Sequence, residues 1–320
     1  MIKKIGVLTS GGDAPGMNAA VRAVVRTAIS KGMEVYGVYR GYMGLITGDI
    51  FRMDERSVTD IIHQGGTILY TARCPEFRTQ EGVAKAKAKC DELGIEGLVV
   101  IGGDGSFRGA ADLSAMGMLC VGIPGTIDND ISCTDYTIGF DTAMNTAMEL
   151  VDKLRDTSQS HDRISVVEVM GRGAGHIAVN TGIACGATDI ITKEVPYDID
   201  SIANTMLEKK AKGKQNFVVI VAEGIGHAQE IATSLQEKTG IEARATILGH
   251  VQRGGSPTLR DRVEATRMGY YAVELLEQGK GNRVVGIKDS QIVDYDIQEA
   301  LAMKKPYDEK LHKIAEEIAF

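Results

Sequence analysis

The sequence predicts an α/β protein in which parallel strands are covered by helices on both faces. Short runs rich in Val, Ile and Leu alternate with segments that carry apolar residues at three- and four-residue steps, which is typical of such sheets. The chain has 320 residues, about twice the length of a typical domain, so we expect two domains. Its 38 glycines gather where predicted strands end, which indicates specialised loops.

The predicted elements are bounded mainly by Gly, Pro and polar residues. The strands cover residues 5–9, 34–39, 97–101, 119–123, 164–170, 217–223, 243–248 and 283–287. The helices include residues 19–30, 81–93, 141–155, 199–210, 228–238 and 263–278. The best break between domains lies near Gly139. Ligands of open α/β sheets bind outside the carboxyl ends of the strands, so the loops there are the candidates for function.

Composition excludes several classes of function. Lys and Arg number 36 against 43 Asp and Glu, a formal net charge of −7, so we expect no nucleic-acid partner. No apolar run reaches the roughly 18 residues that span a bilayer, and the N-terminal residues lead directly into a predicted strand. We therefore expect a cytoplasmic protein without membrane contact. The five cysteines include no CxxC pair, which argues against zinc sites and disulfide frameworks.

Two glycine-rich loops are candidate phosphate sites. Ser10 to Asn18 lies between a predicted strand and a predicted helix, where backbone N–H groups and the helix dipole favour an anion. A turn without a ligand is the alternative for this loop. The second loop, Gly102 to Ser106, also follows a strand. It adds Asp104, a carboxylate of the kind that holds Mg²⁺ beside phosphate oxygens.

A third loop, Pro124 to Asp130, again follows a predicted strand. Its acids Asp128 and Asp130 suit a general base, a metal ligand or an Asx-turn, and the residues alone leave these roles open. The chain contains neither GxGxxG nor GxxxxGK[ST]. The sequence therefore disfavours a dinucleotide-binding oxidoreductase and a Walker-type NTPase.

Basic residues also gather near predicted strand ends and glycines. Guanidinium groups form bidentate bonds to phosphate, so an acidic protein with this pattern is suited to small phosphorylated ligands. For any single arginine, an ordinary solvated position is the alternative. The group comprises Arg73, Arg78, Arg163, Arg172, Arg244, His250 and Arg253.

Taken together, these segments resemble the bacterial-type ATP-dependent 6-phosphofructokinases over essentially the whole chain. The motifs are Leu8-Thr-Ser-Gly-Gly-Asp-Ala-Pro-Gly-Met-Asn18, Ile101-Gly-Gly-Asp-Gly-Ser106, Pro124-Gly-Thr-Ile-Asp-Asn-Asp130, Glu168-Val-Met-Gly-Arg172 and Gly249-His-Val-Gln-Arg-Gly-Gly-Ser-Pro257. The resemblance implies a glycolytic kinase that transfers the γ-phosphoryl group of ATP to the 1-hydroxyl of D-fructose 6-phosphate, giving fructose 1,6-bisphosphate and ADP. It also implies an allosteric homotetramer with active sites shared between subunits.

The resemblance further implies two Rossmann-like three-layer α/β domains with mainly parallel sheets and the active site in the cleft between them. We expect residues 1–138 with 252–304 to form the ATP-binding domain. Residues 139–251 with 305–320 are expected to form the domain that binds fructose 6-phosphate.

The resemblance assigns roles residue by residue. Asp128 is expected to accept the proton of the sugar hydroxyl, with Thr126, Arg172 and Arg73 assisting catalysis, and Asp104 is expected to bind Mg²⁺. The residues expected to hold ATP are Gly12, Arg73, Cys74, Arg78, Gly103, Asp104, Gly105 and Ser106. Those expected to bind the sugar phosphate are Thr126, Ile127, Asp128, Met170, Gly171, Arg172, Glu223, His250 and Arg253, with Arg163 and Arg244 reaching in from a neighbouring subunit.

Two alternatives remain within the same fold. Pyrophosphate-dependent relatives typically carry Asp at the position of Gly105 and Lys at that of Gly125, so the two glycines favour ATP. A sugar-phosphate sensor without catalysis would be expected to lack the base or the metal carboxylate, whereas Asp104 and Asp128 are both present. The sequence does not distinguish fructose 6-phosphate from its epimer tagatose 6-phosphate.

A second, regulatory site is implied in outline. Strongly regulated members are activated by ADP and inhibited by phosphoenolpyruvate, and the matching residues here are Arg22, Arg26, Asp60, Arg155, Gly186, Lys212 and Lys214. Three positions depart from the pattern: Glu55 replaces Arg, Thr188 replaces a carboxylate that meets the effector's Mg²⁺, and Asn216 replaces His. We therefore expect ADP and phosphoenolpyruvate to be weak effectors. The alternative is that Arg56 and Asp189, one residue away, replace the missing groups.

Overall fold

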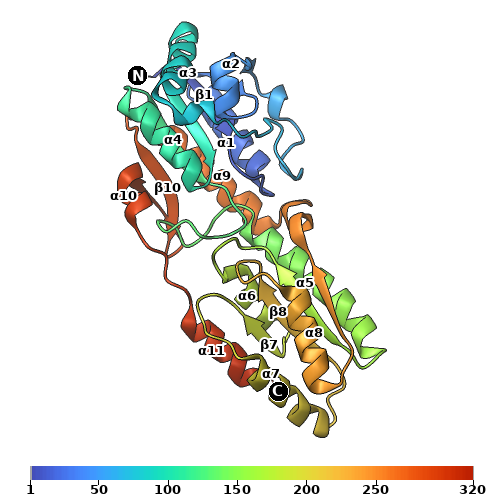
Figure 1. Cartoon of the computed structure of the whole chain (residues 1–320). Coiled ribbons are helices and arrows are strands. Elements are labelled where there is room, and N and C mark those ends of the chain that lie inside the picture. The colour runs from blue at the N-terminus through green and yellow to red at the C-terminus, as the bar shows by residue number, and fades with distance from the viewer. Residues whose placement is uncertain (1, 320) are drawn as a thin grey trace. The chain divides into compact units, whose positions relative to one another are not determined.

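The computed structural model describes residues 2–319, which divide into two compact units. Unit 1 comprises the described residues up to Ile127 together with residues 131–142 and 253–305. Unit 2 comprises residues 128–130, residues 143–252 and the described residues from Pro306 onward. Figure 1 labels the elements of both units.

Unit 1 is built on a mainly parallel sheet. In the described part of the chain this sheet has seven strands in the order β11-β10-β5-β4-β1-β2-β3. The outermost strands, β3 and β11, run antiparallel to β2 and β10, while the inner strands pair in parallel. The strands are β1 (Lys4–Thr9), β2 (Glu34–Val38), β3 (Ile50–Met53), β4 (Gly97–Gly102), β5 (Leu119–Pro124), β10 (Arg283–Lys288) and β11 (Gln291–Asp296).

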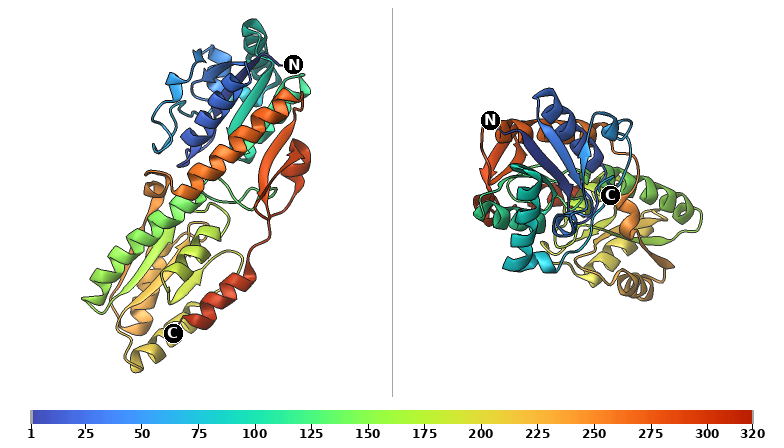
Figure 2. Two further views of the ribbon diagram at one scale, coloured as in Figure 1. Left: turned by 180° about the vertical axis from the view of Figure 1, so that it is seen from behind. Right: turned by 90° about the horizontal axis from the view of Figure 1, so that it is seen from above.

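Helices cover both faces of this sheet. One face packs against α1 (Met17–Ser30) and α9 (Leu259–Glu277), which lie side by side (Figure 2, left). The other face shares a single apolar core with the remaining helices of unit 1. These are α2 (Tyr42–Thr47), α3 (Gln80–Leu93), α4 (Asp104–Ala115), α10 (Ile297–Ala302) and the short η2 (Glu76–Arg78), while η1 (Arg56–Val58) contacts α1.

Unit 2 contains a smaller parallel sheet in the order β7-β8-β6-β9. Its strands are β6 (Ile164–Val169), β7 (Asp189–Ile191), β8 (Phe217–Ala222) and β9 (Ala243–Ile247). One face packs against α7 (Ile199–Ala211) and α8 (Ala228–Thr239). The helices α6 (His176–Ala184) and α11 (Glu309–Ile318) also lie near the sheet. The short η3 (Gly249–Arg253) follows β9 in the chain. The long α5 (Phe140–Gln159) begins in unit 1 and continues in unit 2.

The predicted α/β class with mainly parallel sheets is confirmed, and every predicted strand and helix is present with small shifts at its ends. The sequence analysis missed β3, β7 and β11. The strand β7 has only three residues, and the two edge strands are partly exposed, so they lack the continuous apolar run of a buried strand.

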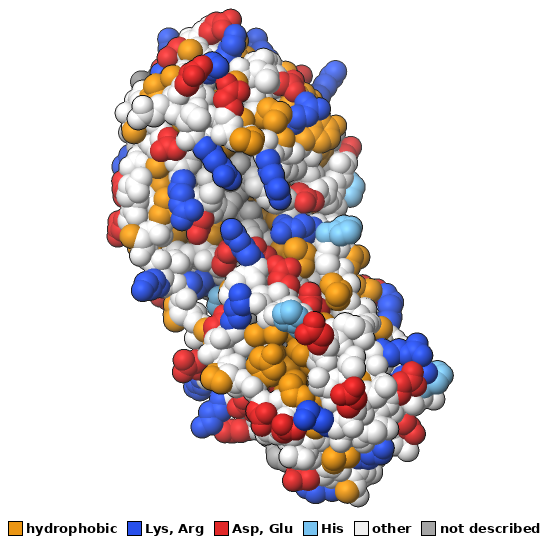
Figure 3. Space-filling view, viewed as in Figure 1, with side chains coloured by type: hydrophobic (Ala, Val, Ile, Leu, Met, Phe, Trp, Pro, Cys, Tyr) orange, Lys and Arg blue, Asp and Glu red, His pale blue; other side chains and the backbone are white. Residues whose placement is uncertain are grey.

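Surface and hydropathy add two observations. Among residues 2–319, no helix combines the length and apolar character needed to cross a bilayer. On the face drawn in Figure 3, Lys and Arg side chains are interspersed with Asp and Glu rather than joined into one basic surface.

Candidate active site

The first glycine-rich loop connects β1 to α1 in unit 1. Gly11 and Gly16 have φ values of 89° and 106°, a left-handed conformation that glycine adopts without steric cost. A Cβ at Gly12 would lie 2.6 Å from Nη1 of Arg253. That nitrogen donates a hydrogen bond of 3.1 Å to the carbonyl of Asp13. Arg253, expected to bind the sugar phosphate, thus lies against the loop expected to bind ATP.

The segment that leads to Arg73 and Cys74 is fastened to this first loop. The Thr9 hydroxyl lies 2.9 Å from that of Thr67, and Thr71 donates a hydrogen bond to the carbonyl of Gly11. Asn18 is 1% exposed, and its Oδ1 accepts a hydrogen bond of 2.8 Å from the amide of Ile68. The guanidinium-bearing residues Arg73 and Arg78 themselves are exposed.

The second loop lies directly beside the first, because β1 and β4 are neighbours in the sheet. The amide of Ser10 donates a hydrogen bond of 2.9 Å to the carbonyl of Ile101. Gly103 is the N-cap residue of α4, and Asp104 lies in the first turn of that helix. A Cβ at Gly103 or Gly105 would meet no atom within 4 Å. The loop therefore presents a helix N-terminus with open space beside its glycines, and Asp104 adds a carboxylate to the same turn, as a phosphate–metal site requires.

An aromatic pair that the sequence analysis missed supports this second loop. The rings of Tyr42 and Phe77 stack with centroids 4.0 Å apart. The Tyr42 hydroxyl donates a hydrogen bond to the carbonyl of Ser106. Gly109 is required here, since its Cβ would lie 2.8 Å from both rings. Burial raises the pKa of Tyr42 well above its ordinary value, so its hydroxyl keeps the proton that it donates.

We extend the name third loop to residues 124–139, from the end of β5 to the start of α5; both ends of this segment lie in unit 1, and they are joined. The amide of Ile138 donates a hydrogen bond of 2.9 Å to the carbonyl of Pro124, and the Thr137 hydroxyl donates one of 2.6 Å to the carbonyl of Thr126. Asp128 belongs to unit 2 and is 6% exposed. The Ile127 side chain is fully buried, which leaves only its backbone for contact with a ligand.

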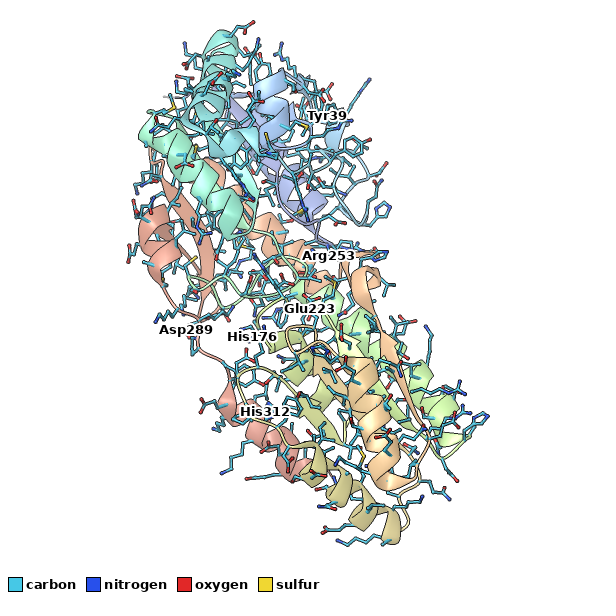
Figure 4. The ribbon with its side chains drawn as sticks, viewed as in Figure 1. Tyr39, His176, Glu223, Arg253, Asp289 and His312 are labelled. Carbon is cyan, nitrogen blue, oxygen red and sulfur yellow. The ribbon has the colours of Figure 1, made fainter. Side chains whose placement is uncertain are left out.

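Unit 2 presents a second group of expected site residues where β6 and β8 end. Gly171 and Arg172 have positive φ values of 143° and 57°. The Arg172 amide donates a hydrogen bond of 2.5 Å to Oε1 of Glu223, which is labelled in Figure 4. The Arg172 side chain is 77% exposed and its Nη1 lies 4.0 Å from a carboxylate oxygen of Asp130. The turn thus orders the backbone of Arg172 while its cationic group stays at the surface.

The neighbouring η3 turn is tied to the same group. The side chain of Gln252 is fully buried, and its Oε1 accepts a hydrogen bond of 2.8 Å from the amide of Met170. His250, in the same turn, is exposed. Gln252 fixes the spacing of two sequence motifs that are far apart in the chain, and the sequence analysis did not single it out.

A further pair of arginines shares one carboxylate. Nε of Arg163 lies 2.7 Å from Oε2 of Glu242, and Nε of Arg244 lies 3.0 Å from Oε1 of the same side chain. Hydrogen bonds from Arg163 and then Arg244 lower the pKa of Glu242. Arg244 also places its Nη2 2.9 Å from Oε1 of Glu242, and its side chain is 66% exposed, whereas that of Arg163 is 18% exposed. Two cations and one anion leave this cluster with a net positive charge suited to phosphate.

The residues expected to bind an effector fall into two groups. Arg22, Arg26 and Asp60 belong to unit 1, and Arg155, Gly186, Lys212 and Lys214 to unit 2. Burial, then nearby Lys209 and Arg155, lowers the pKa of Lys214, which indicates a concentration of positive charge in unit 2. Arg155 donates a hydrogen bond to the carbonyl of Cys185.

The departures from the effector pattern have structural consequences. Glu55 lines a surface hollow of about 430 Å³ together with Glu34, Asp54 and Arg52, so three carboxylates and one guanidinium border it and the net charge disfavours an anion. The Thr188 hydroxyl is engaged by the amide of Val218 at 3.3 Å. Burial raises the pKa of Asp189 to about 6, which makes this neighbour a poor replacement for an exposed metal-binding carboxylate.

Comparisons with known proteins agree with this arrangement of loops. The profile of the phosphofructokinase family matches residues 4–276. The chain is 60% identical over 314 residues to an ATP-dependent 6-phosphofructokinase of Clostridium botulinum, covering 98% of both chains. It is 58% identical to an ATP-dependent 6-phosphofructokinase of Clostridium tetani over the whole of both chains.

A solved structure of phosphofructokinase from Saccharomyces cerevisiae has a TM-score of 0.88 and 38% identity to this chain. The match covers 99% of this chain and 46% of the yeast chain, so the chain spans about half of that relative. The family profile and the near full-length bacterial relatives agree with the glycine-rich loops, the paired acids and the arginines found in the structure. The chain therefore belongs to the phosphofructokinase family.

Proposed function

We propose that this protein is an ATP-dependent 6-phosphofructokinase, a glycolytic kinase that transfers the γ-phosphoryl group of ATP to the 1-hydroxyl of D-fructose 6-phosphate. The products are fructose 1,6-bisphosphate and ADP. The observation that carries the proposal is the 60% identity, over 98% of both chains, to a bacterial relative with that name. The residues that the reaction needs are present on loops at strand ends, where ligands of this fold class bind.

In this proposal unit 1 holds ATP. The adjacent first and second loops offer backbone N–H groups and the start of α4 to the phosphates, while exposed Arg73 and Arg78 add positive charge. Gly12 and the residues from Gly103 to Ser106 allow the nucleotide to approach the backbone. Cys74, which follows Arg73 in the chain, is assigned to the same site. This assignment makes unit 1 the nucleotide-binding domain.

The residues present fit a magnesium ion. Mg²⁺ is usually held by one or two carboxylates together with substrate phosphates rather than by an all-protein cage. Asp104 lies in the first turn of α4 between two glycines that border open space, and residues 2–319 contain no cluster of three or more His, Cys, Asp and Glu residues that would form such a cage. When bound, the ion neutralises charge on the phosphate oxygens.

Asp128 is the proposed general base. A carboxylate is already ionised at neutral pH on its ordinary pKa of about 3.9. It therefore orients the sugar hydroxyl and takes its proton late, as the phosphoryl group is transferred. Thr126, Arg172 and Arg73 assist by positioning and by charge, because phosphoryl transfer depends mainly on alignment and electrostatic stabilisation.

Unit 2 supplies most of the groups proposed for the sugar phosphate. Met170, Gly171 and Arg172 form the turn that Glu223 and Gln252 hold in place. His250 and Arg253 flank Gln252 in the η3 segment. Their donors and the Glu223 carboxylate suit the hydroxyl and phosphate groups of a hexose phosphate.

We also propose that Arg163 and Arg244 serve the active site of a neighbouring subunit in a homotetramer. Arg244 lies on β9, an edge strand of the unit 2 sheet. Two apolar side chains near it in sequence, Ile247 and Val251, are 63% and 49% exposed. Unpaired strand edges with exposed apolar groups suit contact with another copy of the chain.

The structure favours ATP over pyrophosphate as the phosphoryl donor. A Cβ at Gly105 would meet nothing within 4 Å, so the space that an Asp would take in pyrophosphate-dependent relatives is open for a nucleotide. A Cβ at Gly125 would lie 3.1 Å from Cε of Met17 and 3.2 Å from Cγ2 of Ile101. A lysine there would have to displace buried side chains.

A coupled assay with the purified protein tests the proposal. The assay compares ATP with pyrophosphate as donor, and fructose 6-phosphate with tagatose 6-phosphate as acceptor. We expect turnover with ATP and fructose 6-phosphate. Turnover only with pyrophosphate, or binding of the sugar phosphate without turnover of either donor, would reject the ATP-dependent activity in favour of one of the two alternatives.

For the effector residues we propose a site with weak response. Arg22, Arg26, Asp60, Arg155, Gly186, Lys212 and Lys214 retain the positive charge that attracts ADP or phosphoenolpyruvate. The carboxylate of Glu55 and the absence of an exposed carboxylate at Thr188 weaken the binding of a metal-bound anion.

A further inference from the structure

Asp261, in the first turn of α9, is a fully buried carboxylate to which no role has been given so far. Its exposed fraction is 0%. Oδ1 accepts a hydrogen bond of 2.7 Å from the amide of Gly139 and another from the hydroxyl of Tyr136. Oδ2 accepts a hydrogen bond of 2.9 Å from the amide of Thr142 and another from its hydroxyl. A buried charge is tolerated only when it is satisfied in this way.

These four donors come from the end of the third loop and the start of α5. Thr142 is the third residue of α5, and the first amides of a helix have no partner within the helix. Asp261 therefore caps α5 from a different helix. The Thr142 hydroxyl in turn accepts a hydrogen bond of 3.0 Å from the amide of Thr258, the N-cap residue of α9. The two helix starts are thus joined through one carboxylate.

The same carboxylate lies beneath the first loop. A Cβ at Gly16 would lie 3.4 Å from Cβ of Asp261. A Cβ at Gly139 would lie 2.6 Å from Cβ of Ala14 and 3.2 Å from Cγ2 of Ile127, the residue before Asp128. Asp261 thus lies where the nucleotide loop and the base of the third loop meet.

The helix starts and the hydrogen bonds at this point favour the ionised form of Asp261, and burial opposes them. Asp261 lies at the N-terminal ends of two helices, where the helix dipole favours negative charge. Burial is the largest influence and raises the pKa of Asp261, while the hydrogen bonds from Thr142, Tyr136 and Gly139 oppose it. The guanidinium of Arg260 lies 4.4 Å from the centroid of the Tyr136 ring and holds that donor in place.

We propose that Asp261 is a positioning residue that fixes the unit 1 part of the third loop beside the nucleotide loop, and thereby the backbone that leads to Asp128. The inference rests on the proposed function, in which Asp128 is the base. The loop is closed at its base by the Ile138–Pro124 and Thr137–Thr126 hydrogen bonds, so a displacement of Gly139 is transmitted to the segment that carries Asp128. Asp261 touches neither substrate nor metal in this account.

The test compares Asp261→Asn with the wild type and with Asp128→Ser, singly and in combination. The side chain of Asn has nearly the same size as that of Asp, but its NH₂ group is a donor and cannot accept hydrogen bonds from the donors that surround Oδ1 and Oδ2 of Asp261. We expect kcat to fall about 10- to 100-fold with the KM for fructose 6-phosphate changed less than about threefold. If Asp261 acts through Asp128, the same substitution lowers kcat less than about threefold in the Asp128→Ser background.

A matched control separates positioning from general loss of stability. Leu276→Ala removes a fully buried side chain from the other end of the same helix. We expect it to lower the thermal midpoint while kcat stays within about twofold of wild type. Hydrogen exchange gives a readout independent of activity. We expect the backbone amides of residues 124–139 to exchange faster in Asp261→Asn than in the wild type, and at the wild-type rate in Leu276→Ala.

Three results would overturn the inference. They are a near-wild-type kcat in folded Asp261→Asn, an equal loss of kcat in both backgrounds, and unchanged exchange of residues 124–139. If Asp261→Asn does not fold, the variant Tyr136→Phe tests the inference instead, because it removes one of the four hydrogen-bond donors to the Asp261 carboxylate. We expect about a three- to tenfold lower kcat from it, and an unchanged kcat would reject the inference. An inactive wild type would instead reject the proposed function. Hydrogen exchange of residues 124–139 would then be the remaining test of whether Asp261 positions the third loop.

Discussion

The candidate loops of unit 1 and unit 2 differ in how they hold their functional groups. In unit 1 backbone hydrogen bonds join the loops to one another, and the buried residues Thr9 and Asn18 fasten the first loop to the segment at Thr67 and Ile68. In unit 2 the cationic groups pair with protein carboxylates: exposed Arg172 with Asp130, and exposed Arg244 together with the mostly buried Arg163 with Glu242. Under the proposed function, this difference corresponds to a preformed nucleotide site and a sugar-phosphate site whose arginines exchange one anion for another.

Buried acids show the same contrast. Asp261 in unit 1 receives four hydrogen bonds, whereas Asp189 in unit 2 is mostly buried with a backbone hydrogen bond from Ile190 and a charge interaction with Lys209. Burial raises the pKa of both. A well-satisfied buried acid contributes to structure, while a poorly satisfied one costs stability. The four predictions below test these contrasts.

The largest effect is expected at the chemical step. Asp128→Ser should lower kcat about 10²- to 10⁴-fold while substrate affinity changes little, because a general base acts in the transition state. Steady-state kinetics at varied ATP and fructose 6-phosphate measure this. Asp135→Ser is a matched control on the same loop, since that carboxylate bonds to Lys288 and the amide of Asp289. Near-wild-type kcat in Asp128→Ser would remove Asp128 from the mechanism.

Arg163 and Arg244 should affect the affinity for fructose 6-phosphate rather than kcat. Arg163→Ala and Arg244→Ala each remove a charge-assisted phosphate bond of about 1.5–3 kcal/mol, so the KM for fructose 6-phosphate should rise about 10- to 100-fold with little change for ATP. Mixing Arg244→Ala with Asp128→Ser chains should restore activity, because a hybrid oligomer assembles some intact sites. No recovery in verified hybrids would place the whole site within one chain.

Asp189 gives a pH-dependent prediction. Its pKa is raised to about 6, so between about pH 4 and 6 the folded chain keeps a proton that the unfolded chain has lost. The stability contributed by this group therefore falls as pH rises through that range. Asp189→Asn should be about 1–2 kcal/mol more stable than wild type at pH 8, with a smaller difference at pH 5.

Urea denaturation at both pH values measures this difference. Asp156→Asn, an exposed acid of unit 2 on α5, is the control and should differ little from wild type at either pH. A lower stability of Asp189→Asn at pH 8 would show that the charge of Asp189 is well satisfied, and would remove the contrast with Asp261.

The smallest effect is expected from effectors. ADP and phosphoenolpyruvate, titrated at sub-saturating fructose 6-phosphate, should shift the apparent sugar affinity less than about tenfold, or about 1.4 kcal/mol of coupling. Glu55 and the engaged hydroxyl of Thr188 oppose binding of a metal-bound anion. A larger shift would show that the second site works despite these substitutions.

The sequence was sufficient for the parallel sheets and for the loops that follow their strands. Apolar runs mark buried strands, and glycines mark sharp turns, so the residues from Ser10 to Asn18 and from Gly102 to Ser106 were identifiable. The residues that support these loops from elsewhere in the chain were not identifiable from the sequence. Asp261, Gln252 and Tyr42 act on segments far away in the chain, and such partners are set by tertiary packing, which local periodicity does not report.

The structure adds a detail about Arg253 that its motif does not give. His250 and Arg253 share one motif, and the resemblance assigns both to the sugar phosphate, which stays a prediction. In the structure the guanidinium of Arg253 lies over Gly12 and bonds to Asp13 in unit 1. The unit boundary lies between Gln252 and Arg253, one residue from the boundary between residues 251 and 252 that the resemblance implies.

Identification of the product tests the central claim most directly. The purified protein is incubated with ATP, Mg²⁺ and fructose 6-phosphate labelled with ¹³C at carbon 1, and the mixture is followed by ¹³C and ³¹P nuclear magnetic resonance. We predict a new phosphomonoester coupled to the labelled carbon, formed in equal amount with ADP. Formation of ADP with free phosphate alone, or a phosphate on any other carbon, would contradict the proposed transfer from ATP to the 1-hydroxyl.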